Sequence, residues 1–299
     1  MPRLVWSSDW HLVDTIPRCR LDEDWYGFLD RIMKFIVKTA NDKNAILGIG
    51  GDLFGRRSPN ISSYLLSMFI KNVLQVKKGT RILAGNHDEY FHNFDYISKT
   101  SFGVLDAFIK GSDNNDKLSY IDDLGTWLNF NEDIVNPGRE IVFIHRLVFN
   151  SIKNVPPNVQ ASTAQDLLNE FPKAKMILTG DNHTSFIYKK NGRMVINPGS
   201  IYRGDVSQKD IVPTIYYIDT EKEIVEEIKI PDNEKMVEDS YIIERDMKEN
   251  RISAFVEKLR NNESVNLDFL ENIENGLLAN KKLSKDTVKM IRFLCEEEK

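Results

Sequence analysis

Short apolar runs alternate with amphipathic stretches over about the first 200 residues of the chain. Short runs of this kind are typical of buried strands. Residues 22–40 place their apolar side chains on one face, which predicts a helix there. Ser58 followed by Pro59 is typical of a helix cap and first helical position. This alternation predicts an α/β body. The expected strands in this region are 4–8, 45–49, 80–84, 141–144 and 175–178.

Two hairpins are expected after residue 185. Asn191-Gly192 lies between two β-type runs, and this dipeptide is the strongest short signal for a two-residue hairpin turn. A second pair of runs follows with a short polar connection. The four expected strands are 186–190, 193–196, 214–219 and 223–230.

The sequence becomes charged after about residue 232, and apolar stripes at 252–259 and 283–294 predict helices there. We therefore predict two domains, residues 1–231 and a helical C-terminal extension of residues 232–299. The extension either docks a partner or packs on its own core, because any surface helix shows such stripes.

Composition is ordinary for a globular protein, with 41% hydrophobic and 28% charged residues. No apolar run reaches the ~18 residues of a membrane-spanning helix. The N-terminus lacks the basic and apolar segments of a signal peptide. Cys19 and Cys295 are far apart, so a disulfide framework is not expected. These features favour a cytoplasmic protein without a membrane partner.

The net charge of −5 argues at first sight against a nucleic-acid partner. Most of this charge lies in the tail, since residues 232–299 carry 16 acidic and 12 basic side chains. The first 231 residues are almost neutral, with 29 acidic and 28 basic side chains. The body therefore need not repel a polyanion.

Polar clusters follow the predicted strands, and they contain four of the five histidines. Because the carboxyl ends of strands line the ligand crevice of open α/β sheets, we expect these side chains to meet. Oxygen and nitrogen donors in this number suit two divalent cations, and the absence of cysteine disfavours structural zinc. The clusters are Asp9-Trp10-His11, Gly50-Gly51-Asp52, Gly85-Asn86-His87-Asp88, His145 and Gly180-Asp181-Asn182-His183.

The ordered set Asp-x-His, Gly-Asp, Gly-Asn-His-Asp, a lone His and Gly-x-x-His resembles the calcineurin-like metallophosphoesterase family over residues 1–231. The resemblance implies two mixed β-sheets packed face to face between helices, a four-layer α/β/β/α arrangement. It also implies an enzyme that hydrolyses phosphate esters with two divalent metal ions. One ion would be held by Asp9, His11, Asp52 and His183, and the other by Asp52, Asn86, His145 and Asp181.

Asp181 departs from the family pattern, which usually reads Gly-His-x-His at this point. As a ligand, a carboxylate here favours harder ions, so manganese is expected, with magnesium, iron and zinc as alternatives. The other interpretation is that Asp181 only shapes its turn. By resemblance, His87 would stabilise developing charge or protonate the leaving group, and Asp88 would orient the imidazole of His87.

Arginines beside these motifs suit phosphate oxygens, although most surface arginines are only solvated loop charges. Aromatic residues near the site either stack on bases or pack internally. The substrate-binding candidates are Arg18, Arg20, Arg56, Arg57, Arg146, Arg203 and Tyr202, with Trp10, Tyr90 and Phe91 as further stacking candidates.

Two elements are similar to SbcD-type DNA repair nucleases: Gly51-Asp52-Leu53-Phe54 with Pro59 downstream, and Asn197-Pro198-Gly199-Ser200. This resemblance implies a DNA exonuclease or endonuclease that works with a coiled-coil ATPase of the SbcC type. The alternatives are a phosphatase or phosphodiesterase for small nucleotides or phosphoproteins, and a non-catalytic scaffold. The oligomeric state stays open, a homodimer included.

Overall fold

The computed structural model describes residues 3–55, 60–89, 94–111, 117–121, 126–128, 134–135, 140–157, 159–232, 236–239 and 287–288. The chain divides into two compact units, residues 1–239 and 240–299. Apart from the helical pair Thr287 and Val288, the two expected tail helices lie outside the described residues, as do Arg56, Arg57, Tyr90 and Phe91.

The first sheet has the strand order β14-β13-β1-β2-β3-β4. Strands β1 to β4 are parallel, while β13 and β14 run antiparallel to their neighbours. The strands are β1 (Arg3–Ser7), β2 (Ile46–Gly50), β3 (Thr80–Leu83), β4 (Leu118–Tyr120), β13 (Thr214–Asp219) and β14 (Ile224–Lys229).

The second sheet has the order β11-β12-β10-β7-β5-β6 and is also mixed. Asn191 and Gly192 both have positive φ, as the expected two-residue turn between β11 and β12 requires. The strands are β5 (Thr126–Leu128), β6 (Ile134–Val135), β7 (Ile141–His145), β10 (Met176–Gly180), β11 (Phe186–Lys190) and β12 (Arg193–Asn197). A separate small sheet pairs β8 (Val148–Phe149) with β9 (Ser162–Thr163).

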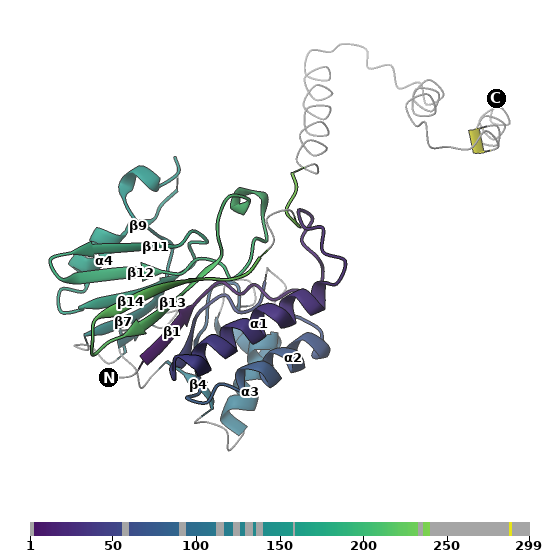
Figure 1. Ribbon diagram of the computed structural model, residues 1–299, viewed down its shortest axis with the longest axis horizontal. Helices are drawn as coiled ribbons and strands as arrows, with labels where there is room; N and C mark the ends of the chain where they lie inside the picture. The colour runs from purple at the N-terminus through teal and green to yellow at the C-terminus, as the bar shows by residue number, and fades with distance from the viewer. Residues whose placement is uncertain are drawn as a thin grey trace, which may run out of the picture. The chain divides into compact units, whose positions relative to one another are not determined.

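Helices cover the outer face of each sheet. On one side, α1, α2 and α3 lie together, and α4 lies with the second sheet (Figure 1). None of the helices in the described ranges is long and apolar enough to cross a bilayer. The helices are α1 (Trp25–Asp42), α2 (Ser63–Val73), α3 (Ser101–Gly111) and α4 (Ala164–Glu170), with short 3-10 helices η1 (Phe94–Lys99), η2 (Ile152–Asn154) and η3 (Val206–Gln208).

Strand alternation divides the apolar side chains into three layers, because successive residues point to opposite faces. In β1, Val5 packs under α1 and α2, while Trp6 faces the second sheet and lies 5.4 Å from Phe143. In β7, Val142 packs instead against α4. The predicted four-layer α/β/β/α fold is therefore confirmed.

The start of α2 differs from the expectation. The helix begins at Ser63 and is capped by Ser62, whose hydroxyl accepts from the backbone N–H of Leu65. The expected cap, Ser58, and the expected first helical residue, Pro59, lie outside the described residues. Ser62 is selected because Asp14, in the loop after β1, accepts hydrogen bonds from both its backbone N–H and its hydroxyl. This tertiary contact was not visible in the local pattern.

Candidate metal centre

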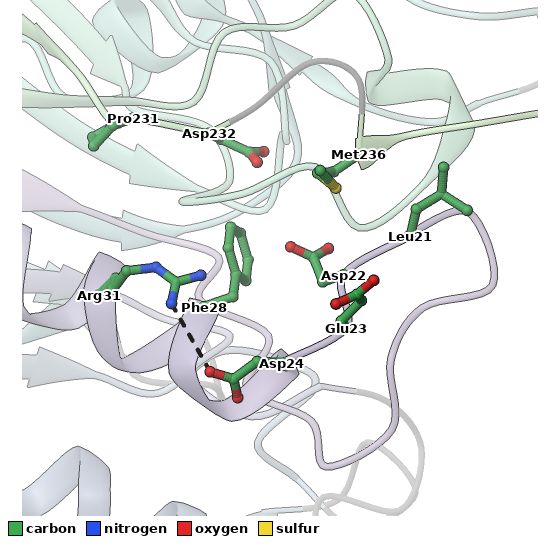
Figure 2. A pocket seen from close by; sticks show the side chains of 9 residues that line it. All are labelled: Leu21, Asp22, Glu23, Asp24, Phe28, Arg31, Pro231, Asp232 and Met236. Atoms are coloured by element: carbon green, nitrogen blue, oxygen red, sulfur yellow. Dashed lines mark ion pairs between the residues drawn. The ribbon is translucent and has the colours of Figure 1, made fainter.

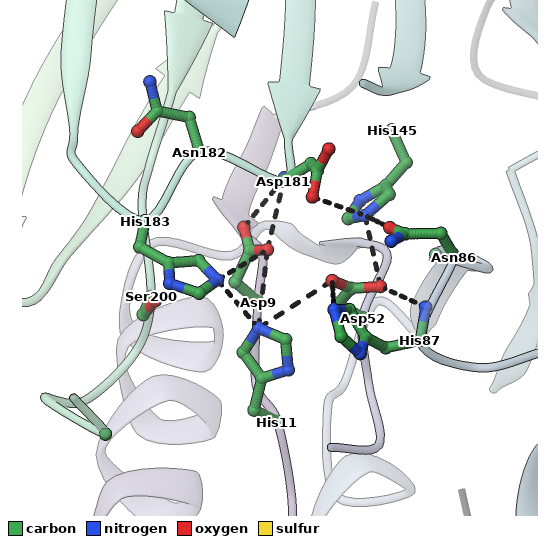
Figure 3. Close-up of polar contacts among 12 residues, drawn as sticks. Asp9, His11, Asp52, Asn86, His87, His145, Asp181, Asn182, His183 and Ser200 are labelled. Carbon is green, nitrogen blue, oxygen red and sulfur yellow. Dashed lines mark hydrogen bonds and ion pairs between the residues drawn. The ribbon is translucent and has the colours of Figure 1, made fainter. Parts of the chain in front are cut away.

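The polar clusters meet where the parallel strands of the two sheets end. The structure brings together donors from five separate segments (Figure 3). The segments leave β1, β2, β3, β7 and β10, and the side chains are Asp9 and His11, Asp52, Asn86 and His87, His145, and Asp181 and His183.

Two groups of donor atoms are close enough to hold a metal ion each. Asp9, His11 and His183 form one group, and Asp9, Asp52 and His145 form the other, with all donor atoms of a group within 4.8 Å of one another. The two oxygens of Asp52 face different groups. Its Oδ1 is 3.2 Å from Nε2 of His145, and its Oδ2 is 3.8 Å from Nε2 of His11. This geometry suits a carboxylate shared by two ions.

A buried oxygen of Asp52 indicates that the cluster fits cations. Asp52 Oδ1 accepts from the backbone N–H of His87 at 2.9 Å, but the buried Oδ2 has no hydrogen-bond partner among the described residues. A buried carboxylate oxygen without a partner is costly. Divalent cations held by this donor set would supply the missing partner.

Strained backbone holds the ligands in place. Asp9, His11, Asp52 and Asp181 all have positive φ, between 42° and 74°. Such conformations cost about 1–3 kcal/mol each for non-glycine residues and cluster at functional sites. Backbone bonds hold two of them, from Asp9 N to Gly51 O at 3.1 Å and from His11 N to Asp52 O at 2.9 Å.

His145, at the end of β7, is oriented by the end of β2 in the other sheet. Its Nδ1 is 2.7 Å from the carbonyl oxygen of Gly50, so Nδ1 donates there and Nε2 points into the cluster. Nε2 lies 3.0 Å from Oδ1 of Asn86. Gly51, with φ of 100°, leaves room for this ring, since a Cβ there would lie 2.3 Å from Nδ1.

Burial removes the ionisable groups of the cluster from water and opposes their charged forms. Burial raises the pKa of Asp9 to about 8 and lowers the pKa of His11 to about 3. Burial also opposes ionisation of Asp52, but the charge of His145 outweighs it and keeps the pKa of Asp52 below its usual value. For His145, burial is outweighed by Asp52, so the pKa is raised. Bound cations would compensate these carboxylates.

Asp181 lies beside the cluster but belongs to neither donor group. Its backbone N–H is 3.2 Å from both carboxylate oxygens of Asp9, and its Oδ1 is 4.0 Å from Nε2 of His145. The side chain turns toward His145 (Figure 3). These contacts are compatible with Asp181 as a metal ligand and with Asp181 as a residue that only shapes its turn. Ligation by Asp181 stays a prediction.

The profile of the family described as Calcineurin-like phosphoesterase matches residues 2–195, which include all these candidate ligands. The chain belongs to the calcineurin-like phosphoesterase family. Members use divalent metals, in agreement with the two donor groups. No curated protein matches the sequence.

Several solved structures are similar to this calcineurin-like phosphoesterase at low sequence identity. An archaeal phosphodiesterase is 16% identical, over 76% of this chain and 99% of that chain, with a TM-score of 0.40. A dimetal phosphatase from Danio rerio is 10% identical, over 77% of this chain and 99% of that chain, with a TM-score of 0.43. Vps29 from Entamoeba histolytica, complexed with zinc, is 12% identical, over 77% of this chain and 99% of that chain, with a TM-score of 0.33.

Three expected substrate-binding residues are instead structural in this phosphoesterase. Arg20, Arg203 and Tyr202 are buried. The two guanidinium groups share Asp232, at 3.0 Å from Arg20 Nη1 and 3.1 Å from Arg203 Nε. Tyr202 donates to the backbone oxygen of His11 at 2.7 Å. Their expected contacts with substrate are therefore wrong, because these polar groups already have buried partners.

Two further expectations are corrected. Trp10 is fully buried, donates to the hydroxyl of Ser7 and packs edge-on against Phe69, so it does not stack on a base. The carboxylate of Asp88 accepts hydrogen bonds from three backbone N–H groups rather than orienting the His87 imidazole. The donors are Leu53, Phe54 and Gly85. Asp88 thus joins the loops after β2 and β3.

Among the other arginine candidates, Arg18 is exposed, and Arg146 is partly exposed and bonded to Glu170 at 2.8 Å. Both stay predictions as substrate contacts. The sequence analysis missed one residue at the site: Gln208, buried in η3, contacts the ring of His183 at 2.7 Å. The spacing of Asp205 and Gln208 is that of a capping box, which indicates the start of a helix but not a contact with a metal-binding histidine.

A surface pocket is lined in part by Asp22 and Asp232 (Figure 2), the two carboxylates that pair with Arg20. None of its described lining residues belongs to the metal cluster, so the pocket and the metal centre are separate features. The lining is Leu21, Asp22, Glu23, Asp24, Phe28, Arg31, Pro231, Asp232 and Met236.

Replacing Asp232 by Ala is expected to lower the free energy of unfolding by about 3–5 kcal/mol, because it leaves two buried guanidinium groups without their shared partner. Urea denaturation measures this loss. Asp42→Ala is the matched control, since Asp42 pairs with Lys38 on the surface and should cost under about 1 kcal/mol. Equal losses in the two variants would show that the network does not stabilise the fold.

Proposed function

We propose that this protein is a two-metal phosphodiesterase that cleaves DNA, with manganese as its metal. The observation that carries the phosphodiesterase proposal is the position of His87. It lies outside both donor groups, yet its Nε2 is 3.9 Å from Oδ2 of Asp52 and its ring meets the ring of His11 edge-on at 5.2 Å. An imidazole beside the cluster is available for proton transfer.

The backbone places His87 at this point. Its N–H donates to Asp52 Oδ1, and Asp88 fixes the same turn through the N–H groups of Gly85, Leu53 and Phe54. The imidazole is about one third exposed, at 33%, so a substrate can reach it. In our proposal, His87 donates a proton or hydrogen bond to the leaving oxygen of the ester.

The remaining chemistry follows from the charge of the site. When bound, two divalent ions would neutralise phosphoryl charge and lower the pKa of a water molecule. The protein's part is to hold the donor atoms in strained, buried loops and to keep His87 beside the phosphoryl position. Asp9 and Asp52 supply the negative charge that retains cations at the site. Asp181 as a third carboxylate is our reason for proposing manganese.

The DNA proposal rests on the SbcD-type elements Gly51-Asp52-Leu53-Phe54 and Asn197-Pro198-Gly199-Ser200. Arg18 is exposed in the loop that follows β1 and could meet a phosphate backbone. By the same resemblance, we propose a coiled-coil ATPase of the SbcC type as partner, bound through residues 232–299. The compartment we propose is the cytoplasm.

A second candidate is a phosphodiesterase for small nucleotides. The observation that favours it is the burial of Arg20, Arg203 and Tyr202, which removes three of the expected contacts with a long polyanion. A small diester needs fewer basic contacts outside the metal centre than a DNA strand does.

A substrate comparison with manganese tests the proposal. Wild-type protein and Asp52→Asn are incubated with linear duplex DNA, a single-stranded oligonucleotide, bis-p-nitrophenyl phosphate and p-nitrophenyl phosphate. The proposal predicts DNA cleavage by the wild type that Asp52→Asn loses. Cleavage of the chromogenic diester without DNA cleavage would support the small-nucleotide candidate, and hydrolysis of the monoester alone would contradict both.

A further inference from the structure

Gln208 contacts the nitrogen of His183 that does not face the other metal-binding donors. Nε2 of His183 lies 3.0 Å from Nε2 of His11, whereas its Nδ1 lies 2.7 Å from Nε2 of Gln208. Gln208 is buried and ends η3. Gln208 lies beyond residue 195, where the family match ends, whereas His183 lies within the match.

The orientation of the Gln208 amide is determined by its other partners. Its Oε1 accepts from the backbone N–H of Gly204 at 2.6 Å and of Asp205 at 3.1 Å. Backbone N–H groups only donate, so the oxygen must face them and the NH₂ group must face His183. Nδ1 of His183 therefore accepts a hydrogen bond.

This contact decides which nitrogen of His183 carries the proton. A neutral imidazole has one N–H, so when Nδ1 accepts, the proton lies on Nε2. Nε2 can then donate to Nε2 of His11, which is 3.0 Å away. A protonated Nε2 has no lone pair for a cation.

Ligation through Nε2 would move the proton of His183 to Nδ1. Two donors would then face each other across the 2.7 Å contact with Gln208. Turning the amide would relieve this contact but would place the NH₂ group against the N–H groups of Gly204 and Asp205. Either arrangement leaves buried donors without acceptors, which is costly.

We propose that Gln208 is a positioning residue that disfavours the ligating tautomer of His183. It thereby lowers the affinity for the cation that Asp9, His11 and His183 would hold. The inference rests on the proposed two-metal function but concerns only cation binding. A glutamate at position 208 removes the mismatch, because one carboxylate oxygen keeps the two backbone bonds and the other accepts from Nδ1–H. Carboxylate–histidine pairs of this kind support metal-binding histidines in other proteins.

Titration calorimetry with manganese and no substrate tests the inference. Gln208→Glu should lower the manganese Kd of the site formed by Asp9, His11 and His183 by about tenfold or more, since such supporting contacts change metal affinity about 10–100-fold. Gln75→Glu adds the same charge at an exposed glutamine and should leave both Kd values unchanged. An unchanged or higher Kd in folded Gln208→Glu would overturn the inference.

Nitrogen NMR of histidine-labelled, metal-free protein provides a second test, whose first measurement uses the wild-type residue at position 208. The wild type should show the Nε2–H tautomer for His183, with the signal assigned by its loss in His183→Asn. In Gln208→Glu the signal should change to Nδ1–H, which added charge alone does not explain. A wild-type Nδ1–H tautomer would refute the role of Gln208. Both tests are made without DNA, so a failed cleavage assay leaves their result intact.

Discussion

Asp52→Asn is expected to lower kcat/KM for a phosphodiester by about a thousandfold or more. One oxygen of Asp52 lies near His145 and the other near His11, which belongs to the other donor group, and the oxygen near His11 is buried with no hydrogen-bond partner among the described residues. Metal ions supply several kcal/mol of transition-state stabilisation, and each 1.36 kcal/mol corresponds to a tenfold change in rate. Steady-state kinetics with manganese measures the loss.

Asp42→Asn provides the control for this prediction. It makes the same chemical change at an exposed residue that pairs with Lys38 at the end of α1. Its kcat/KM should equal that of the wild type. If Asp52→Asn kept wild-type activity while binding as much manganese as the wild type, the shared carboxylate would not be needed for catalysis.

His87→Ala is expected to lower kcat by about 10²–10⁴, the usual contribution of a positioned acid or base, with manganese binding retained. The reason is that His87 lies outside both donor groups although its imidazole adjoins Asp52 and His11. Kinetics and manganese calorimetry on the same preparation separate the two properties.

His145→Ala gives the contrasting result. His145 belongs to a donor group and lies 3.2 Å from Asp52, so its loss should reduce manganese binding as well as turnover. Undiminished turnover in His87→Ala would remove the acid role. Loss of manganese in His87→Ala would instead mean that His87 holds a cation.

The layered fold was predictable because strand and turn signals are local. Short apolar runs marked β1, β2, β3, β7 and β10 nearly to the residue, and Asn191-Gly192 marked the hairpin. The start of α2 was not predictable in the same way. Ser58 and Ser62 are both suitable caps in sequence, and the contact of Ser62 with Asp14 favours the second.

The meeting of the donors was predictable because parallel strands bring their carboxyl ends to one edge. The roles of residues around them were not. Arg20 and Arg203 resemble phosphate-binding arginines in sequence, but their shared partner Asp232 is 212 residues from Arg20. Distant pairings of this kind decide whether an arginine is buried or exposed, and a local pattern does not contain them.

The roles of Asp88 and Gln208 depend on side-chain direction. Asp88 follows His87 directly, which suggested a pair, yet its carboxylate points to the backbone of the neighbouring loop. Gln208 is 25 residues from His183, and the only local pattern it belongs to is the capping box with Asp205. Both roles require the coordinates because loops, unlike strands, have no fixed alternation of side chains.

Manganese stoichiometry tests the central claim most directly. Metal-free wild-type protein and Asp52→Ala are dialysed against manganese at equal free concentration, and bound metal is measured per chain. Because each donor group would hold one ion, the wild type should bind two and Asp52→Ala clearly fewer. A wild type that binds no more manganese than Asp52→Ala would contradict a two-cation centre built around Asp52.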